Sequence, residues 1–234
     1  MLRSSVLDTF IFKDQQIYLR AFHIDRTFEA YQQIFPHILR IDVEKIYLDL
    51  EVKLKKQVSD EQLVRLVVLE SSPLKYSYEI HPKLFLAEPV VLELVTEIKC
   101  PAGRGQQNYK WLDRDLWMRL MRARQTEAAD VLAQNTLGQV TETSRCNIFI
   151  YNSVKDAAFT PTLDSGCING VYRRYALAQK SIDLPQLGKK VLVERDILAD
   201  ELLSHPDLYT IYLANSARGV LKACLISKNQ KPKN

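Results

Sequence analysis

The first hundred residues alternate between strand-like and helix-like patterns of hydrophobic positions. Apolar runs at Val6 to Phe12 and Gln16 to Leu19 flank a short polar turn, which predicts a pair of strands. Helical spacing follows from about Asp25 to Ile38, and the S-x-x-Q pattern beginning at Ser59 is typical of a capping box that opens a second helix. Further strands are expected at Leu66 to Leu69, Lys75 to Ile80 and Val90 to Ile98. This order predicts a small α+β unit.

The second half of the chain opens with an amphipathic helix and continues mainly as strands. Leu112, Leu116 and Leu120 keep helical spacing, with arginines mostly on the other faces. A loop from Asp164 to Gly170 is expected to lead into a helix from Val171 to Lys180. Strands are expected at Val140 to Tyr151, Ala157 to Thr160, Leu208 to Leu213 and Val220 to Ile226. This half is predicted to be a larger unit rich in β-structure.

Glycine is distributed unevenly between the two halves. All seven glycines follow residue 100. Because glycine permits tight turns and a close approach of backbone to a ligand, we expect the binding site mainly in the second half. The segment from Cys100 to Gly105 has the composition of a connection. We predict domains over residues 1–100 and 110–234, joined by a linker over 101–109.

Composition excludes several classes of protein. A chain of 234 residues with 47% hydrophobic and 26% charged residues can bury a core and is neither fibrous nor disordered. The net charge of +4 is spread along the chain, which argues against a nucleic-acid partner but leaves anionic small molecules open. No apolar run approaches the roughly 20 residues of a membrane span, and the start lacks the apolar region of a signal peptide, so we expect a cytoplasmic protein without a membrane partner.

The cysteines show no metal or redox pattern. None of the four has the C-x-x-C spacing of zinc or redox sites, so we expect reduced thiols and no metal centre: Cys100, Cys146, Cys167 and Cys224.

Two glycine-containing loops could bind an anion. Asn169 and Gly170 lead into a helix whose first N–H groups have no intrahelical partner, an arrangement that suits phosphate. The turn from Asn215 to Gly219 offers a hydroxyl and further N–H groups. Each loop could equally be an ordinary tight turn, but together they suggest one anion held from two sides.

Several residues that could react or bind a ligand also have a simpler interpretation as ordinary surface residues. His23 and Arg26 lie one helical turn apart and could face one partner, although a solvated helix start is the simpler interpretation. Lys110 lies in an apolar context that would lower the pKa of a buried amine, but most lysines are surface charges. Glu142 lies in a predicted strand and could equally face solvent.

These motifs occur together in a recognisable order. The runs Val140 to Phe149 and Thr160 to Arg173 closely resemble the signature of class IV, or fold type IV, pyridoxal-phosphate enzymes. That family includes branched-chain and D-amino-acid aminotransferases and aminodeoxychorismate lyase. The resemblance extends to Lys110 to Arg114, to His23-x-x-Arg26 and to Asn215 to Val220. It implies a two-domain α+β or α/β fold, with pyridoxal 5′-phosphate in the cleft between the domains and a homodimeric assembly.

The resemblance also implies roles for individual residues. Lys110 resembles the lysine that bonds to the cofactor aldehyde and then moves the substrate proton, and Glu142 resembles the glutamate that pairs with the pyridine nitrogen. Asp8 and Thr9 resemble the E-T pair of the lyase, which places Thr9 near the reacting face. The implied phosphate contacts are Arg26, Gly170, Val171, Tyr172 and Ser216. Asn147 and Arg173 match recurrent positions that we expect to be structural.

The resemblance favours one reaction and leaves others open. As the lyase, the chain would release pyruvate from 4-amino-4-deoxychorismate and leave 4-aminobenzoate for folate synthesis. The alternatives are an aminotransferase for branched-chain or D-amino acids and a cofactor-free binding module of the same fold. Where many lyases have an arginine two residues after the threonine, this chain has Ile11. Arg104 is the candidate for the missing substrate-binding charge, with Ala217 as a second substrate contact.

Overall fold

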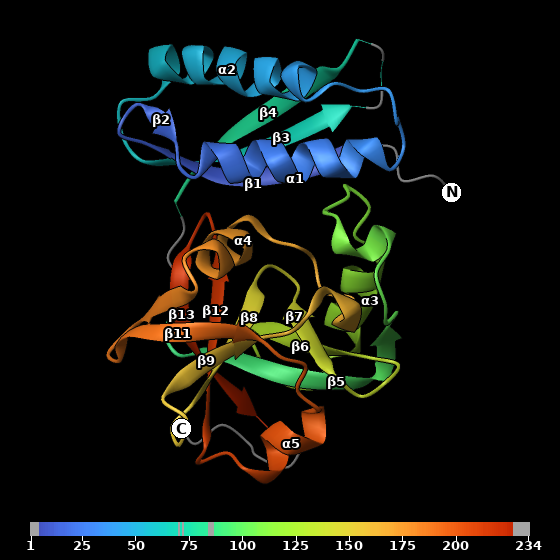
Figure 1. The fold of residues 1–234 in the computed structure, drawn as a ribbon, viewed down its shortest axis with the longest axis vertical. Helices are drawn as coiled ribbons and strands as arrows, with labels where there is room; N and C mark the ends of the chain where they lie inside the picture. The colour runs from blue at the N-terminus through green and yellow to red at the C-terminus, as the bar shows by residue number, and fades with distance from the viewer. Residues whose placement is uncertain (1–4, 70, 72, 84–86, 227–234) are drawn as a thin grey trace.

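The smaller of two β-rich units is formed by the first part of the chain. The computed structural model describes residues 5–69, 71, 73–83 and 87–226. The elements of this unit are β1 (Ser5–Lys13), β2 (Gln16–Ile17), α1 (Arg20–Gln32), α2 (Arg40–Gln57), β3 (Gln62–Leu69) and β4 (Lys75–Pro82). The strands form an antiparallel sheet in the order β2-β1-β3-β4, with both helices beside it (Figure 1).

Successive side chains of β1 point to opposite faces of this sheet, and this alternation determines which residues lie on each face. Val6 and Phe10 pack with apolar residues of α1 and α2 in the core of the unit. Leu7 and Thr9, which project to the opposite face, line a cavity together with residues of the larger unit. The helices therefore bury one face of the sheet and leave the other to form one wall of the cavity.

The larger unit contains the remaining elements. They are β5 (Val90–Cys100), η1 (Gln106–Asn108), α3 (Asp115–Ala123), β6 (Asp130–Asn135), β7 (Val140–Thr143), β8 (Asn147–Asn152), β9 (Ala157–Thr160), η2 (Leu163–Ser165), α4 (Val171–Ala178), β10 (Ser181–Leu184), β11 (Gly188–Glu194), α5 (Ala199–Ser204), β12 (Tyr209–Asn215) and β13 (Gly219–Ile226). The strand order is β10-β11-β9-β8-β12-β13-β5-β6-β7, and β7 also pairs with β8. That pairing closes part of the sheet into a barrel, which leaves fewer unpaired strand edges.

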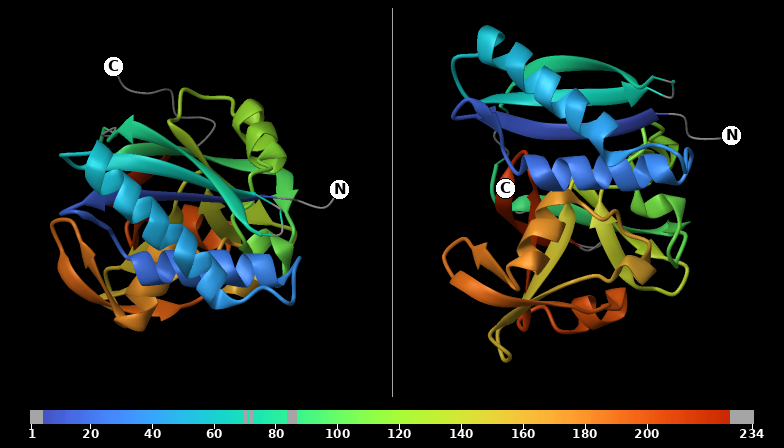
Figure 2. Two further views of the ribbon diagram at one scale, coloured as in Figure 1. Left: turned by 90° about the horizontal axis from the view of Figure 1, so that it is seen from above. Right: turned by 45° about the horizontal axis from the view of Figure 1, so that its top comes forward.

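The two units meet along β1 and along α1. The backbone N–H of Leu7 donates to the carbonyl of Lys110 at 3.0 Å, and that of Leu112 donates to the carbonyl of Ser5 at 2.9 Å. Helix α1 lies against α4 (Figure 2), where both guanidinium Nη atoms of Arg174 pair with the carboxylate of Glu29, at 2.7 and 2.5 Å. These contacts fix how the small unit covers the large one.

The connection after β5 packs on the loop that precedes α4. The N–H of Gly103 donates to the carbonyl of Asp164 at 2.6 Å, and the side-chain amide of Asn108 donates to the carbonyl of Cys167 at 2.7 Å. Gly166 has a φ of +91°, and a Cβ there would lie 2.1 Å from the carbonyl oxygen of Pro101. Only glycine fits this contact.

The mixed α/β fold predicted from sequence is confirmed, but the small unit differs in its details. The first helix lies at Arg20–Gln32, earlier than predicted. No helix begins at Ser59, because the chain turns there into β3. The second helix is Arg40–Gln57, which the sequence analysis missed.

The boundary between the units also differs from the prediction. The strand Val90–Cys100 does not belong to the small sheet but pairs in parallel with β13 and β6 of the large one. The predicted boundary of the small unit at residue 100 therefore lies too far along the chain, because the large sheet already includes β5. The expected single strand Val140 to Tyr151 is two strands, β7 and β8, joined by a turn. Within the described ranges, no helix has the length and apolar character needed to cross a membrane.

We predict that Gly166→Ala destabilises the protein more than Gly138→Ala does. Both glycines have positive φ, but a Cβ at Gly138 meets nothing within 4 Å. Gly138→Ala should lower the free energy of unfolding by about 1–2 kcal/mol through backbone strain alone. Gly166→Ala should cost roughly 1–3 kcal/mol more because its methyl group also overlaps Pro101. Urea unfolding of both variants measures the difference, and equal costs would contradict the close contact.

Candidate active site

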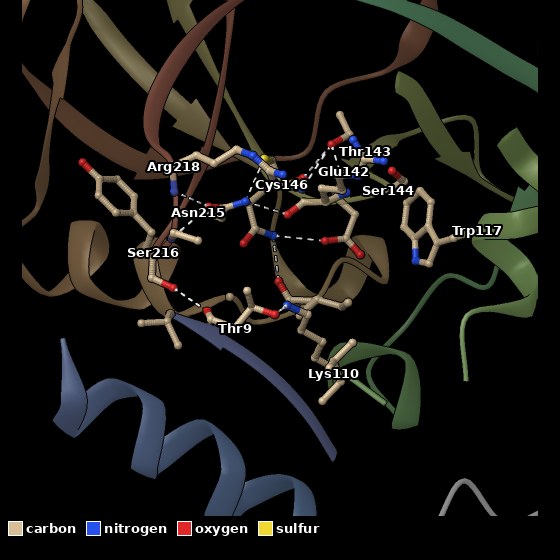
Figure 3. A pocket seen from close by; sticks show the side chains of 18 of the residues that line it. Thr9, Lys110, Trp117, Glu142, Thr143, Ser144, Cys146, Asn215, Ser216 and Arg218 are labelled. Atoms are coloured by element: carbon tan, nitrogen blue, oxygen red, sulfur yellow. Dashed lines mark hydrogen bonds between the residues drawn. The ribbon is translucent and has the colours of Figure 1, made fainter. Parts of the chain in front are cut away.

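A cavity of about 540 Å³ lies between the two units. The small unit contributes residues of β1, α1, β3 and β4, and the large unit contributes the segment before α3, the β7–β8 turn, the start of α4 and the β12–β13 turn. Figure 3 shows side chains of β1, of the segment before α3 and of the β7–β8 and β12–β13 turns pointing toward one another. The cavity therefore brings together parts of the chain that are far apart in sequence.

The amine of Lys110 lies at the junction of the two units. Its Nζ is 3.3 Å from the hydroxyl oxygen of Thr9, a residue of the facing strand β1 (Figure 3). Burial and the positive charge of Arg26 lower the pKa of Lys110 to about 7, although the charge of Asp8 opposes the shift. A large fraction of this amine is therefore neutral and nucleophilic near neutral pH.

Glu142 supplies a buried carboxyl group on the other side of the cavity. Burial raises its pKa to about 7, and the backbone hydrogen bond from Ile168 and the charge of Arg114 reduce the rise. The side-chain amide of Asn147 donates to its Oε2 at 3.3 Å. A cationic N–H in the cavity would find here a carboxylate that protein groups only partly satisfy.

Asn147 joins Glu142 to the loop before α4. Besides Glu142, its amide donates to the carbonyl of Ile168 at 2.8 Å. A Cβ on Gly170 would lie 2.1 Å from Oδ1 of Asn147, so a larger residue could not begin α4 at this place. The first N–H groups of α4, at Val171 and Tyr172, border the cavity and carry the positive end of the helix dipole.

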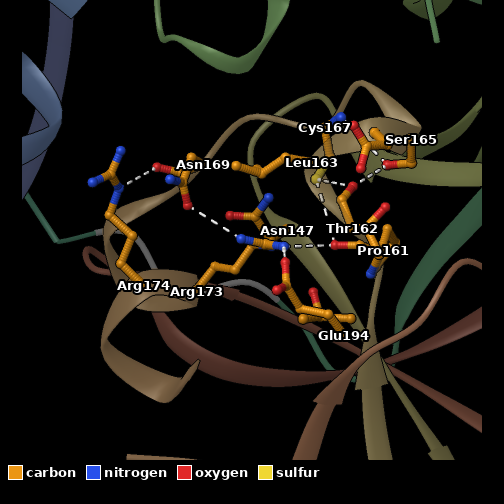
Figure 4. Close-up of polar contacts among 12 residues, drawn as sticks. Asn147, Pro161, Thr162, Leu163, Ser165, Cys167, Asn169, Arg173, Arg174 and Glu194 are labelled. Atoms are coloured by element: carbon orange, nitrogen blue, oxygen red, sulfur yellow. Dashed lines mark hydrogen bonds and ion pairs between the residues drawn. The ribbon is translucent and has the colours of Figure 1, made fainter. Parts of the chain in front are cut away.

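Arg173 holds the same loop from beneath (Figure 4). The guanidinium group is buried and donates to the carbonyl of Pro161 at 2.8 Å and to Oδ1 of Asn169 at 3.2 Å. It also pairs with Glu194. Arg173 and Asn147 thus have the structural roles expected from sequence, while Asn147 in addition lines the cavity.

Arg26 is held by an acidic residue beneath the cavity. The guanidinium pairs with the fully buried carboxylate of Asp8, which also accepts from His23 Nδ1 at 2.7 Å and from the hydroxyl of Tyr47 at 2.5 Å. Burial on its own would raise the pKa of Asp8, but His23, Arg26 and Tyr47 hold it well below its usual value. The Nε of Arg26 is buried and has no hydrogen-bond partner among the described residues. The side chain is thus fixed while part of its donor capacity stays free.

The β12–β13 turn closes the cavity beside Thr9. The hydroxyl of Ser216 donates to the carbonyl of Thr9 at 3.3 Å. Ala217 and Arg218 follow Ser216 and also line the cavity. Their backbone N–H groups donate to Oδ1 of Asn215, at 2.9 and 2.8 Å.

The structure brings nine of the ten predicted site residues to the cavity: Thr9, Arg26, Lys110, Glu142, Gly170, Val171, Tyr172, Ser216 and Ala217. Arg104 is not among the lining residues. Its Nε pairs with Oδ1 of Asp164 at 3.1 Å, and 68% of its side chain is exposed. The structure thus gives no support to Arg104 as the substitute charge for Ile11.

Sequence reasoning missed two features of the site. The sequence motif placed Asp8 beside Thr9 but assigned it no role of its own. Asp8 anchors Arg26 only because β1, α1 and α2 meet around its carboxylate. The positively charged lining was also missed: Arg65, Arg114, Arg145 and Arg218. These arginines come from separate segments, so no local pattern could have grouped them.

One comparison with known proteins identifies a family. The model of the amino-transferase class IV family matches residues 5–226. No curated protein sequence matches the chain.

Three solved structures illustrate the similarity of fold. The 4-amino-4-deoxychorismate lyase of Pseudomonas aeruginosa is 16% identical, with a TM-score of 0.75 over 96% of this chain and 83% of that one. The branched-chain amino acid aminotransferase of Escherichia coli is 13% identical, with a TM-score of 0.77 over 98% of this chain and 79% of that one. A hypothetical aminotransferase from Mycobacterium tuberculosis in its PLP-bound form is 17% identical, with a TM-score of 0.75 over 100% of this chain and 84% of that one. At these identities the structures support the fold and do not distinguish one reaction from another.

We predict that Glu142 makes the protein less stable as pH rises toward 8. Because the folded state raises the pKa of Glu142 from 4.5 to about 7, the folded protein binds one more proton than the unfolded chain between these values. Its stabilising contribution is present below pH 4.5 and is lost as pH rises through 7. Relative to Glu142→Gln, the wild-type free energy of unfolding should fall by about 3 kcal/mol from pH 4.5 to pH 8.

Urea unfolding of both proteins across this pH range provides the measurement. The glutamine variant is the matched control, because it keeps the shape of the side chain and cannot ionise. A difference between the two proteins that does not vary with pH would show that Glu142 is not buried as described.

Proposed function

We propose a lyase reaction for this chain, which belongs to the amino-transferase class IV family and is therefore an enzyme of a pyridoxal-phosphate-dependent family. That membership bears out the resemblance inferred from the motifs. The proposed reaction eliminates pyruvate from 4-amino-4-deoxychorismate and leaves 4-aminobenzoate. The observation that carries the proposal is the approach of Lys110 Nζ to Thr9 Oγ1 inside a cavity that also contains Glu142.

The residues of the cavity suit pyridoxal 5′-phosphate. Lys110 offers an amine of lowered pKa for an aldehyde, and the incompletely satisfied carboxylate of Glu142 suits a protonated ring nitrogen. A phosphate group would be held by the free donor capacity of Arg26 and the N–H groups at the start of α4. The hydroxyl of Ser216 would join them by turning from the carbonyl of Thr9. When bound, this cofactor supplies an electron-accepting ring that stabilises negative charge at the reacting carbon of the substrate.

The chain's own residues then perform binding and proton transfer. The amine of Lys110, once free, is placed to take a proton from the substrate and to return it, because its pKa lies near neutrality. The hydroxyl of Thr9 accepts a hydrogen bond from this amine and orients it. The sheet of the small unit covers the site and limits the access of water.

A second candidate is an aminotransferase acting on branched-chain or D-amino acids. The match of residues 5–226 to the amino-transferase class IV family keeps this candidate open. A cofactor-free binding module of the same fold is disfavoured, because it would have no use for a buried lysine and a buried glutamate of strongly shifted pKa. A homodimeric assembly and a cytoplasmic location belong to the proposal as well.

Reduction with borohydride tests the cofactor, and product analysis tests the reaction. After incubation with pyridoxal phosphate, borohydride should fix one cofactor on the peptide that contains Lys110, as detected by mass spectrometry. Lys110→Ala should fix none, and labelling spread over exposed lysines would contradict the proposal. With 4-amino-4-deoxychorismate the loaded enzyme should release pyruvate. Formation of glutamate from 2-oxoglutarate and an amino acid, without pyruvate, would favour the aminotransferase.

A further inference from the structure

The cavity contains more positive charge than the cofactor needs. Its lining includes one lysine and five arginines: Lys110, Arg26, Arg65, Arg114, Arg145 and Arg218. The one acidic residue among its described lining residues is Glu142. In the proposed function, Lys110 and Glu142 bind the cofactor and Arg26 binds its phosphate. Of the other arginines, Arg65 forms an ion pair with Glu79 and Arg114 donates to the carbonyl of Ser144.

Arg218 is the most distinctive of these arginines. Its Nε is buried without a hydrogen-bond partner, and no carboxylate forms an ion pair with it in the part of the chain that the structure describes. Figure 3 shows its side chain lying alongside Cys146 in the cavity. A buried donor left unpaired is unfavourable, so this guanidinium group is suited to an acceptor that arrives from outside the chain.

The backbone that carries Arg218 is fixed before any ligand binds. The side chain of Asn215 accepts the N–H of Arg218 at 2.8 Å and donates to the carbonyl of Arg145 at 3.0 Å. The Asn215 amide also contacts the sulfur of Cys146 at 3.2 Å. These contacts connect the β12–β13 turn to the segment between β7 and β8. Binding of an anion by Arg218 would therefore cost little conformational entropy of the backbone.

Arg218 and the reacting amine of Lys110 border the same cavity. Cys146 interacts electrostatically with both Arg218 and Lys110, and all three residues line the same cavity. A substrate bound beside Lys110 could therefore meet Arg218 with a second group.

We propose that Arg218 is a specificity-determining residue that binds a second carboxylate of the substrate, which selects dicarboxylates over aliphatic monocarboxylates. The proposal rests on the proposed function and specifies its substrate class. A planar guanidinium group can donate two parallel hydrogen bonds to a carboxylate. An aliphatic amino acid would offer this guanidinium no acceptor for its unpaired donor, so the same residue disfavours the wrong substrate.

Binding of two aromatic acids to the cofactor-loaded enzyme tests the proposal. Isophthalate and benzoate differ by one carboxylate, and calorimetry gives the Kd of each. Wild-type enzyme should bind isophthalate more tightly. Arg218→Met should weaken isophthalate binding by about 10–100-fold, the loss expected for charge-assisted hydrogen bonds, and should leave benzoate binding nearly unchanged. Arg218→Lys, which keeps the charge but not the planar donor pair, should be intermediate.

Matched controls separate this effect from charge and from folding. Arg119→Met removes the same charge at an exposed position outside the cavity lining and should alter neither Kd. Thermal melting and the absorbance of the bound cofactor should be unchanged in Arg218→Met. Isophthalate binding that is equal in wild type and Arg218→Met would overturn the proposal, as would an equal loss for both acids.

The outcome also separates this proposal from the proposed function. Pyruvate release with an unchanged isophthalate Kd in Arg218→Met would refute the role of Arg218 and leave the lyase reaction standing. Selective loss of isophthalate binding in a loaded enzyme that forms no pyruvate would support the role of Arg218 and refute the lyase reaction.

Discussion

The site depends on a short backbone pairing between β1 and the segment before α3. Two hydrogen bonds form it, Leu7 N–H to Lys110 at 3.0 Å and Leu112 N–H to Ser5 at 2.9 Å. Strand alternation then turns Thr9 toward the cavity and Asp8 toward the helices. This pairing brings Lys110 Nζ to 3.3 Å from Thr9 Oγ1, although the two residues are 101 positions apart in sequence. Without it the small unit would not cover the amine, and the burial that lowers its pKa would be lost.

Burial then determines the electrostatics of the cavity. It lowers the pKa of Lys110 and raises that of Glu142, each to about 7, so both groups change charge in the same range of pH. Asp8 stays ionised beneath them and balances the charge of Arg26. A cofactor with a cationic ring nitrogen and an anionic phosphate would complement these charges. The same geometry leaves Arg218 without a partner for the substrate to fill.

The sequence predicted the fold class and which residues border one cavity, but not how the strands divide between the two sheets. Short runs such as Asn169 to Tyr172 determine where backbone N–H groups point, and nine of the ten predicted residues do border one cavity. Which sheet contains β5 depends on its parallel partners β6 and β13, which lie far along the chain, so local pattern could not assign it. The position of Arg104 depends likewise on its distant partner Asp164. Asp8 illustrates the same limit, because its donors come from α1 and α2.

The titration of Lys110 tests the central claim most directly. Protein labelled with ¹³C at lysine Cε, with the Lys110 resonance assigned by Lys110→Arg, reports the protonation of this amine by nuclear magnetic resonance. In the cofactor-free protein the midpoint should lie near pH 7, because burial and Arg26 disfavour the charged form. Arg26→Met should raise it. A midpoint near the value of 10.5 usual for lysine would mean that the amine is solvated and that the two units do not enclose it.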